Sequence, residues 1–452
     1  MTRTAIHASR RTQHGAATLI VALLLLIGIT LVGLYANRGL LLEQRASANQ
    51  LRSTSAFEVA EAGLEWAVAR LNDRQTLAAA PSCAPAVAAS GDFAERYLPL
   101  LPTGFGIDTA AAPGCSIAAS GALTCQCPTA ASATVGGANE PRFRVRFRAV
   151  AGDPWAVEVQ SFGCTGADCV PGGASTADAV AVVSAVYKMR PAYPNAPNAG
   201  LITGALALPG GNMRVVNTDP ESNGITINAG TTVDLGGSSG VVTIPGTPPN
   251  ASVLDNDPSL SELSTRDGTG DLFFSTFFGQ TMEQYKSDPT TFVLSGSCSG
   301  RTLCSACSAG NDCARKLADA YDRGYRRFWS DLDLAFTTST LPSTTVAADG
   351  TKLIGTPERP VSIATSANIE LRAKVTAYGM FYSNRADWDY EGSGASKVFG
   401  AFVARSDFNK GAGGLDLVYD PNLFRPTNAR GTMIRVPGSW RDSLEPYQPF
   451  SN

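Results

Sequence analysis

The chain begins with a short polar stretch, followed by a long apolar run and then by a helical pattern of small and apolar residues. The apolar run from Ala16 to Ala36, AATLIVALLLLIGITLVGLYA, has no charged residue and is about long enough to cross a bilayer as a helix. Beyond Arg38 the small or apolar residues that recur at helical spacing are Ala56, Ala60, Gly63, Ala67 and Leu71. We therefore predict one helix over residues 16–74, of which residues 16–36 are transmembrane.

The residues before the apolar run form a basic leader. Residues 1–15, MTRTAIHASRRTQHG, contain Arg3, Arg10 and Arg11 but no acidic residue. Positive charge before a membrane span holds that end in the cytoplasm, so we expect everything after Arg38 to be exported. An ordinary signal peptide would have a shorter apolar core and a small-residue cleavage site after it, whereas here the helical pattern continues.

Residues 75–190 are predicted to form a disulfide-containing head. The part before about Gly137 is rich in Ala, Pro, Ser and Gly, which is typical of loops. Three strands follow, and they begin at Pro141 (PRFRVRFRAV), Trp155 (WAVEVQSFGC) and Ala179 (AVAVVSAVYKM). An antiparallel sheet of these strands, packed on the second half of the long helix, would make this head.

The rest of the chain is predicted to be a second, β-rich unit. The segment PAYPNAPNAG, residues 191–200, is a predicted linker. Residues 201–452 then break into short β segments with glycine turns, such as MRVVNT, GITINAG and VVTIPG, which suggests stacked rungs although no strict repeat period is visible. We predict an α+β chain whose large Gly-rich C-terminal domain is an irregular β-helix or another layered β fold.

Composition excludes most catalytic designs. With 36 basic and 39 acidic residues, the net charge of -3 gives no global attraction to nucleic acid or anionic lipid. The two histidines, His7 and His14, both precede Ala16, so a mature protein without its leader would lack the commonest general base and metal ligand. The sequence also has no serine elbow and no phosphate loop. We predict that the protein is not an enzyme and has no catalytic residue.

The cysteines fall into a front group of six and a rear group of four. Even, local groups in an exported chain are typical of disulfides. Cys304 and Cys307 also have the spacing of a redox or zinc motif, but no histidine lies near them to complete a metal site. We predict disulfides without assigning pairs; the candidates are Cys83, Cys115, Cys125, Cys127, Cys164, Cys169, Cys298, Cys304, Cys307 and Cys313.

The amino terminus resembles the class III signal of type IV pilins, a short basic leader that ends in glycine before an apolar helix. Within that group, the stretches HGAATLI, RGLLLEQRASANQLRS and FEVAEAGLEWAVARLN resemble the PilX-type N-terminal domain, over roughly residues 13–72. The resemblance implies cleavage after Gly15 by a prepilin peptidase, methylation of Ala16 at the new amino terminus, and storage in the inner membrane. Another alignment of the apolar run places the cut after Ala16, and both registers stay open.

Major pilins carry a glutamate as the fifth residue of the mature chain. Here the fifth residue is Ile20 or Val21, depending on the register, and the first acidic residue is Glu43. In the family this glutamate is thought to pair with the amino terminus of the adjacent, earlier subunit, because a lone carboxylate among apolar helices is costly. A subunit without it needs no such partner, which favours a tip or initiation position. The alternative is drift in a protein that stays in the membrane.

The strand that begins at Pro141 places four arginines on one face: Arg142, Arg144, Arg146 and Arg148. Such a row could bind DNA phosphates, but no base-stacking aromatic residue shares the face. We therefore expect a solvated sheet face, partly balanced by Glu158 across the ladder, and no DNA partner.

Two acidic segments are the metal candidates. DGTGD contains Asp267 and Asp271, and DWDYE contains Asp387 and Asp389. Their carboxylates could hold calcium, but neither segment matches a full calcium loop, and surface turns of this composition are common. Calcium stays an open candidate at these two segments, and we expect no other cofactor.

The residues and the resemblance together predict a minor type IV pilin with a structural role, which helps to initiate pilus assembly and sits at or near the tip. Its implied partners are other minor pilins, the major pilin, a PilY-type tip adhesin and the prepilin peptidase. It would lie in the inner membrane with a periplasmic body before assembly and in the pilus on the cell surface afterwards, with roles in adhesion and twitching motility. The alternatives are an adhesin or ligand-binding tip subunit for a glycan, a surface or DNA, and a capping pseudopilin of a type II secretion system.

Overall fold

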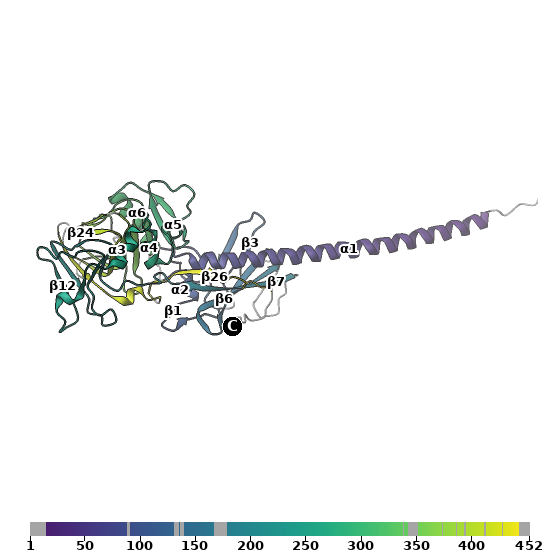
Figure 1. The fold of residues 1–452 in the computed structure, drawn as a ribbon. Helices are drawn as coiled ribbons and strands as arrows, with labels where there is room; N and C mark the ends of the chain where they lie inside the picture. The colour runs from purple at the N-terminus through teal and green to yellow at the C-terminus, as the bar shows by residue number, and fades with distance from the viewer. Residues whose placement is uncertain are drawn as a thin grey trace, which may run out of the picture.

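The chain folds into a long helix, an antiparallel head and a parallel β body, which follow one another along an elongated molecule (Figure 1). The computed structural model describes residues 15–87, 91–130, 135, 140–166, 179–337, 339–341, 351–372, 374–385, 387–392, 395–410, 413–426 and 428–442. The chain contains both helices and strands, with a long amino-terminal helix packed on an antiparallel sheet, so the fold is α+β, as predicted.

Helix α1 (Gly15–Asn72) is 58 residues long and therefore spans about 87 Å. It continues without a break from the apolar run into the head, as the sequence pattern predicts. The residues of its second half that point into the head share helical spacing and are buried; they are Ala56, Ala60, Leu64, Ala67 and Leu71. The first half projects away from the folded part of the chain (Figure 1).

The sheet of the head is antiparallel and has the strand order β26-β7-β6-β5-β3-β4. Its strands are β3 (Gly114–Ile117), β4 (Leu123–Gln126), β5 (Arg142–Val150), β6 (Asp153–Thr165), β7 (Ala179–Arg190) and β26 (Thr432–Arg435). Alternate residues of β5 and β6, among them Phe143, Val145 and Val159, pack on α1 in one apolar core. Three short elements lie beside this sheet: α2 (Phe93–Tyr97), β1 (Leu100–Leu101) and β2 (Gly104–Phe105).

Gly163 in β6 lets α1 lie unusually close to the sheet. A Cβ atom there would lie 2.1 Å from the carbonyl oxygen of Ala56 and 2.4 Å from the backbone nitrogen of Ala60. Gly163→Ala is therefore expected to lower the free energy of unfolding by about 3 kcal/mol, measured by urea denaturation, because the helix has to move off the sheet. Gly296→Ala is the control, since open space surrounds Gly296. Equal losses in the two variants would contradict this explanation.

The end of the chain returns to the head. Strand β26 pairs with β7, with Thr432 opposite Arg190, and the backbone N–H of Val186 donates to Ser439 Oγ at 3.0 Å. We predicted a single C-terminal domain over residues 201–452, and the structure differs at this end. Only Met433 of the short strand enters the head core, so the sequence has no alternating pattern that would reveal it.

Residues 201–418 form a three-sided β-helix in which the described strand pairs are parallel. The first face contains β18 (Lys352–Ile354), the start of β21 (Val375–Ser383), the start of β23 (Ala395–Ala404), β25 (Gly414–Val418), β10 (Asn212–Val216) and β12 (Gly240–Val242). The second contains β15 (Cys304–Ala306), β14 (Thr291–Ser295), β16 (Arg327–Ser330), β19 (Val361–Thr365), the ends of β21 and β23, β8 (Leu201–Thr203), β11 (Ile227–Ala229) and β13 (Val253–Leu254). The third contains β17 (Leu334–Phe336), β20 (Ile369–Leu371), β22 (Asp387–Gly392), β24 (Asp407–Lys410) and β9 (Ala207–Leu208).

Two strands turn a corner of the β-helix at a glycine. The start of β21 pairs with β18 and its end pairs with β19, and Gly379 lies at the bend with a φ of 144°. Gly400 occupies the same position in β23, with a φ of 128°. A Cβ atom at Gly379 would lie 1.8 Å from the carbonyl oxygen of Val361 on the neighbouring rung, so only glycine fits this corner.

The rungs are not stacked in sequence order. Strand β10 pairs with β25 and β8 pairs with β23, so the first rung in the sequence stacks on the last one. From there the chain runs outward to β13 through η1 (Pro249–Ser252). Three helices then cover the outside of the second face before β14; they are α3 (Pro258–Thr265), α4 (Asp271–Phe278) and α5 (Met282–Ser287). Helix α6 (Asn311–Asp322) packs on β14 and β17 at the other end, and η2 (Pro421–Phe424) follows β25.

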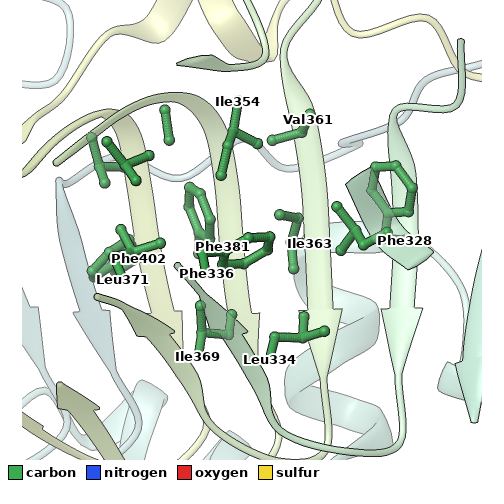
Figure 2. Packing of buried hydrophobic residues seen from close by; sticks show 14 of the residues in the cluster. Phe328, Leu334, Phe336, Ile354, Val361, Ile363, Ile369, Leu371, Phe381 and Phe402 are labelled. Atoms are coloured by element: carbon green, nitrogen blue, oxygen red, sulfur yellow. The ribbon is translucent and has the colours of Figure 1, made fainter. Parts of the chain in front are cut away.

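Inside the β-helix, inward-pointing apolar residues from all three faces form one core (Figure 2). Aromatic rings from successive rungs of the second face are neighbours there, since the ring centroids of Phe381 and Phe402 are 5.3 Å apart. Figure 2 labels Phe328, Leu334, Phe336, Ile354, Val361, Ile363, Ile369, Leu371, Phe381 and Phe402 in this core. Each rung buries its apolar side only because the next rung covers it, which is how the chain obtains a core from very short strands.

Candidate functional site

The first half of α1 is an exposed apolar surface. None of the segment from Thr18 to Tyr35 is buried within the chain, and by length and composition this segment could cross a membrane. A contiguous apolar surface of this size is unfavourable in water. It therefore has to contact lipid or other apolar helices.

The predicted processing residues lie at the start of α1. Gly15 is the first residue of the helix, while residues 1–14 and the side chains of Ala16 and Ala17 lie outside the described part of the chain. Ile20 and Val21 are 60% and 57% exposed, so the fifth residue faces outward in either cleavage register. The register itself stays a prediction.

A buried carboxylate lies at the joint between the head and the β-helix. Asp288 is 1% exposed in its side chain, and its Oδ2 lies 2.7 Å from Nη2 of Arg190 at the end of β7. The same oxygen lies 3.4 Å from Nη1 of Arg327 in β16. Thr432 Oγ1 donates to it at 2.7 Å, and the backbone N–H of Thr290 donates to Oδ1 at 2.9 Å. One carboxylate thus connects two strands of the head with the β-helix.

Asp288 is held in its charged form. Burial alone would raise the pKa of this carboxyl group, but the guanidinium of Arg327 and the hydrogen bonds from Thr290 and Thr432 outweigh burial and lower the pKa. Burial would likewise lower the pKa of Arg327, yet Tyr285 and Asp288 raise it. The pair is therefore ionic at neutral pH.

Three further contacts cross the joint near the end of α1. The backbone N–H of Thr76 donates to the carbonyl of Arg323 at 3.0 Å. Arg430 Nη2 donates to the carbonyl of Leu98 at 2.6 Å, and Arg359 Nε lies 3.1 Å from Glu95 Oε1. These contacts fix the β-helix at the end of α1 that is opposite to its apolar half (Figure 1).

The predicted arginine row of β5 is not fully solvated. Arg142 and Arg144 are 2% and 1% exposed. Nη1 of Arg142 donates to the carbonyl of Val135 at 2.7 Å, and Nη1 of Arg144 approaches the carbonyl of Ala112 at 3.5 Å. The prediction of a solvated face is wrong for these two residues, because backbone carbonyls from neighbouring loops cover their guanidinium groups. Neither is accessible to a DNA phosphate in this structure.

The described calcium candidates are used in local hydrogen bonds. Asp267 accepts from the backbone N–H groups of Gly270 at 2.8 Å and Leu272 at 2.7 Å, at the start of α4. Asp271 accepts from the backbone N–H of Met282 at 2.8 Å. The side chains of Asp387 and Asp389 in β22 lie outside the described part. Among the described residues, no group of three or more His, Cys, Asp or Glu side chains is placed to hold a metal.

The cysteines pair within the front and rear groups. The disulfides are Cys83–Cys127, Cys115–Cys125, Cys298–Cys304 and Cys307–Cys313. Cys164 is also disulfide-bonded, while Cys169 lies outside the described residues. Cys304 and Cys307, which have redox or zinc-like spacing, therefore belong to two different disulfides.

Comparison with known families identifies the start of the chain. Residues 14–65 match the family model described as PilX N-terminal. Over these residues the chain is similar to the PilX N-terminal family. This PilX-type segment covers the apolar half of α1, which is long and apolar enough to cross a membrane, and the first buried turns in the head. The match does not extend to the head sheet or the β-helix.

Comparisons with solved structures and with curated proteins add no further information about fold or function. Among solved structures, the chain is similar to the competence-associated pilin ComZ from Thermus thermophilus, with 11% identity and a TM-score of 0.22. The similarity covers 86% of this chain and 97% of that chain, but a TM-score this low supports no argument about fold or function. A search of curated proteins gave no match.

Proposed function

We propose that the protein is a minor type IV pilin that helps to initiate pilus assembly and sits at or near the pilus tip. The observation that carries the proposal is helix α1, whose fully exposed apolar half lies in a PilX-type segment and whose other half is buried in a head. An anchor of this form suits storage in the inner membrane and later packing against the helices of other pilins.

The position of the β-helix supports a place at the tip. It is fixed beyond the head, at the end of α1 opposite to the apolar half (Figure 1). A subunit stacked beyond that end would have to fit around the β-helix, whereas a terminal subunit leaves it free to meet a partner such as a PilY-type adhesin.

The charge pattern of α1 also supports a position at the tip. No acidic residue precedes Glu43, so the apolar half contains no carboxylate that would need the amino terminus of an earlier subunit. The subunit can therefore enter a helix bundle without a neighbour above it.

Mass spectrometry of the mature amino terminus tests this proposal. We expect a methylated Ala16 or Ala17 in protein from sheared pili, at much lower abundance than the major pilin, and the observed residue fixes the cleavage register. Immunogold labelling of the β-helix is expected at one end of the filaments. An intact Met1 that is found only in the membrane fraction would mean an ordinary anchored envelope protein and would overturn the proposal.

A further inference from the structure

A cavity of about 50 Å³ in the joint between the head and the β-helix is rich in arginine. The charged residues that line it are Arg74, Arg326, Arg327, Arg359, Arg430, Asp92 and Glu95. Five guanidinium groups thus face two carboxylates, and the lining has three positive charges in excess.

Four of these arginines have partners in the protein. Arg74 Nη1 lies 3.5 Å from Asp92 Oδ2, and Arg359 Nε lies 3.1 Å from Glu95 Oε1. Arg327 is paired with Asp288, as described above. Nη1 of Arg326 donates to the backbone carbonyls of Tyr321 and Tyr325, both at 2.7 Å. The two carboxylates of the lining thus form their close ion pairs with Arg74 and Arg359.

Arg430 forms a hydrogen bond through one of its two terminal nitrogens but not through the other, among the residues that the structure describes. Its Nη2 donates to the carbonyl of Leu98, but its Nη1 is buried and has no hydrogen-bond partner among the residues that the structure describes. Burial lowers the pKa of Arg430 to about 10. Arg74 and Arg359 act in the same direction, while Asp92 and Glu95 oppose this shift without cancelling it. A buried cation with a free donor and two cationic neighbours is unfavourable unless an anion compensates it.

We propose that this cavity binds one small tetrahedral oxyanion, of the phosphate or sulfate class, which fastens the β-helix to the head. Guanidinium groups match such anions because their planar N–H donors can each contact two oxygens. The cavity has room for roughly four water-sized atoms, as many as the oxygens of the anion. The inference concerns the joint alone and does not depend on the role in pili.

Thermal unfolding of the mature full chain in detergent micelles tests the site. Sodium phosphate and sodium sulfate are each compared with sodium chloride at equal ionic strength. The wild type is expected to show a saturable rise of a few degrees in Tm with an oxyanion, since a ligand of the folded state stabilises it. Arg430→Met is expected to lose this rise. Arg425→Met is the matched control and should keep it, because Arg425 is exposed and lies outside the cavity, 3.8 Å from Glu221.

Calorimetric titration with inorganic phosphate gives an independent measurement. The wild type should bind about one phosphate per chain, and Arg430→Met at least about tenfold more weakly. If Arg430→Met does not fold, Arg359→Met is used as the test variant instead, since Arg359 also lines the cavity. It is expected to show the same loss of phosphate binding. An equal rise in Tm with chloride would overturn the proposal. A second result would also overturn the proposal. In that result the Tm of the wild type does not rise with phosphate or sulfate and is no higher than that of Arg430→Met, because water alone would then fill the cavity.

Discussion

A chain that carries Gly15→Val is expected to remain an uncut precursor and to leave cells without pili. This expectation rests on the proposed function. Gly15 ends the basic leader and begins α1, and the PilX-type resemblance implies that a prepilin peptidase cuts after it. A β-branched side chain next to the cut bond should block cleavage, and an anchor that keeps its charged leader cannot leave the membrane to join a helix bundle.

Immunoblots for precursor size and electron microscopy of the cells measure the two effects. Gly33→Val is the control for processing, because it places the same side chain in α1 at a position with open space around it and away from the cut. Its precursor should be cut normally. Normal pili together with an uncut Gly15→Val precursor would contradict the assembly role. A cut Gly15→Val protein with normal pili would instead place the cleavage after Ala16.

The sequence predicts α1 and the middle of the head well, because in these elements one local pattern decides both structure and burial. Ala56, Ala60 and Ala67 recur at helical spacing and are all buried in the head. In β5 the alternating Phe143, Val145 and Phe147 enter the same core. Each of these elements is long enough for its period to be visible in the sequence.

The architecture of the β-helix is only partly predictable. Its strands are short, so their glycine turns indicate rungs but not which rungs are neighbours. The pairing of Val216 with Val418 joins residues from the two ends of the unit, and nothing local specifies it. Parallel pairing of this kind depends on non-local contacts, which a pattern in one segment does not encode.

The joint was not predicted, because its residues look like ordinary surface charges in the sequence. Asp288 is separated from Arg190 by 98 positions and from Arg327 by 39, so no motif connects them. The arginine row of β5 shows the opposite error. Alternation correctly placed Arg142 and Arg144 on one face, but it could not show that loop carbonyls cover that face.

Asp288→Asn is expected to lower the free energy of unfolding at neutral pH by about 3–5 kcal/mol. The substitution keeps the shape of the side chain but removes the charge that compensates Arg327, which is buried, and Arg190. Breaking a buried ion pair on one side costs this much because the remaining cation stays buried without its partner. Urea denaturation at pH 7, followed by tryptophan fluorescence, measures the loss.

The same carboxylate predicts how the stability depends on pH. Because the pKa of Asp288 is lowered in the folded state, its contribution is fully present above the unfolded pKa of about 3.9 and is lost as the pH falls through the lower folded value. The wild type should therefore lose this part of its stability only below about pH 4. Asp288→Asn should lack this contribution at every pH. The difference in free energy of unfolding between the wild type and Asp288→Asn should therefore become smaller in acid.

Asp153→Asn is the control for a carboxylate in an exposed pair. Asp153 is 31% exposed in its side chain and lies 2.7 Å from Nζ of Lys188, a more exposed partner. Such pairs contribute at most about 1 kcal/mol, so this variant should stay close to the wild type at pH 7. Two results would show that the ionised carboxylate does not hold the β-helix on the head. One is a free energy of unfolding for Asp288→Asn equal to that of Asp153→Asn. The other is a difference in stability between Asp288→Asn and the wild type that does not change in acid.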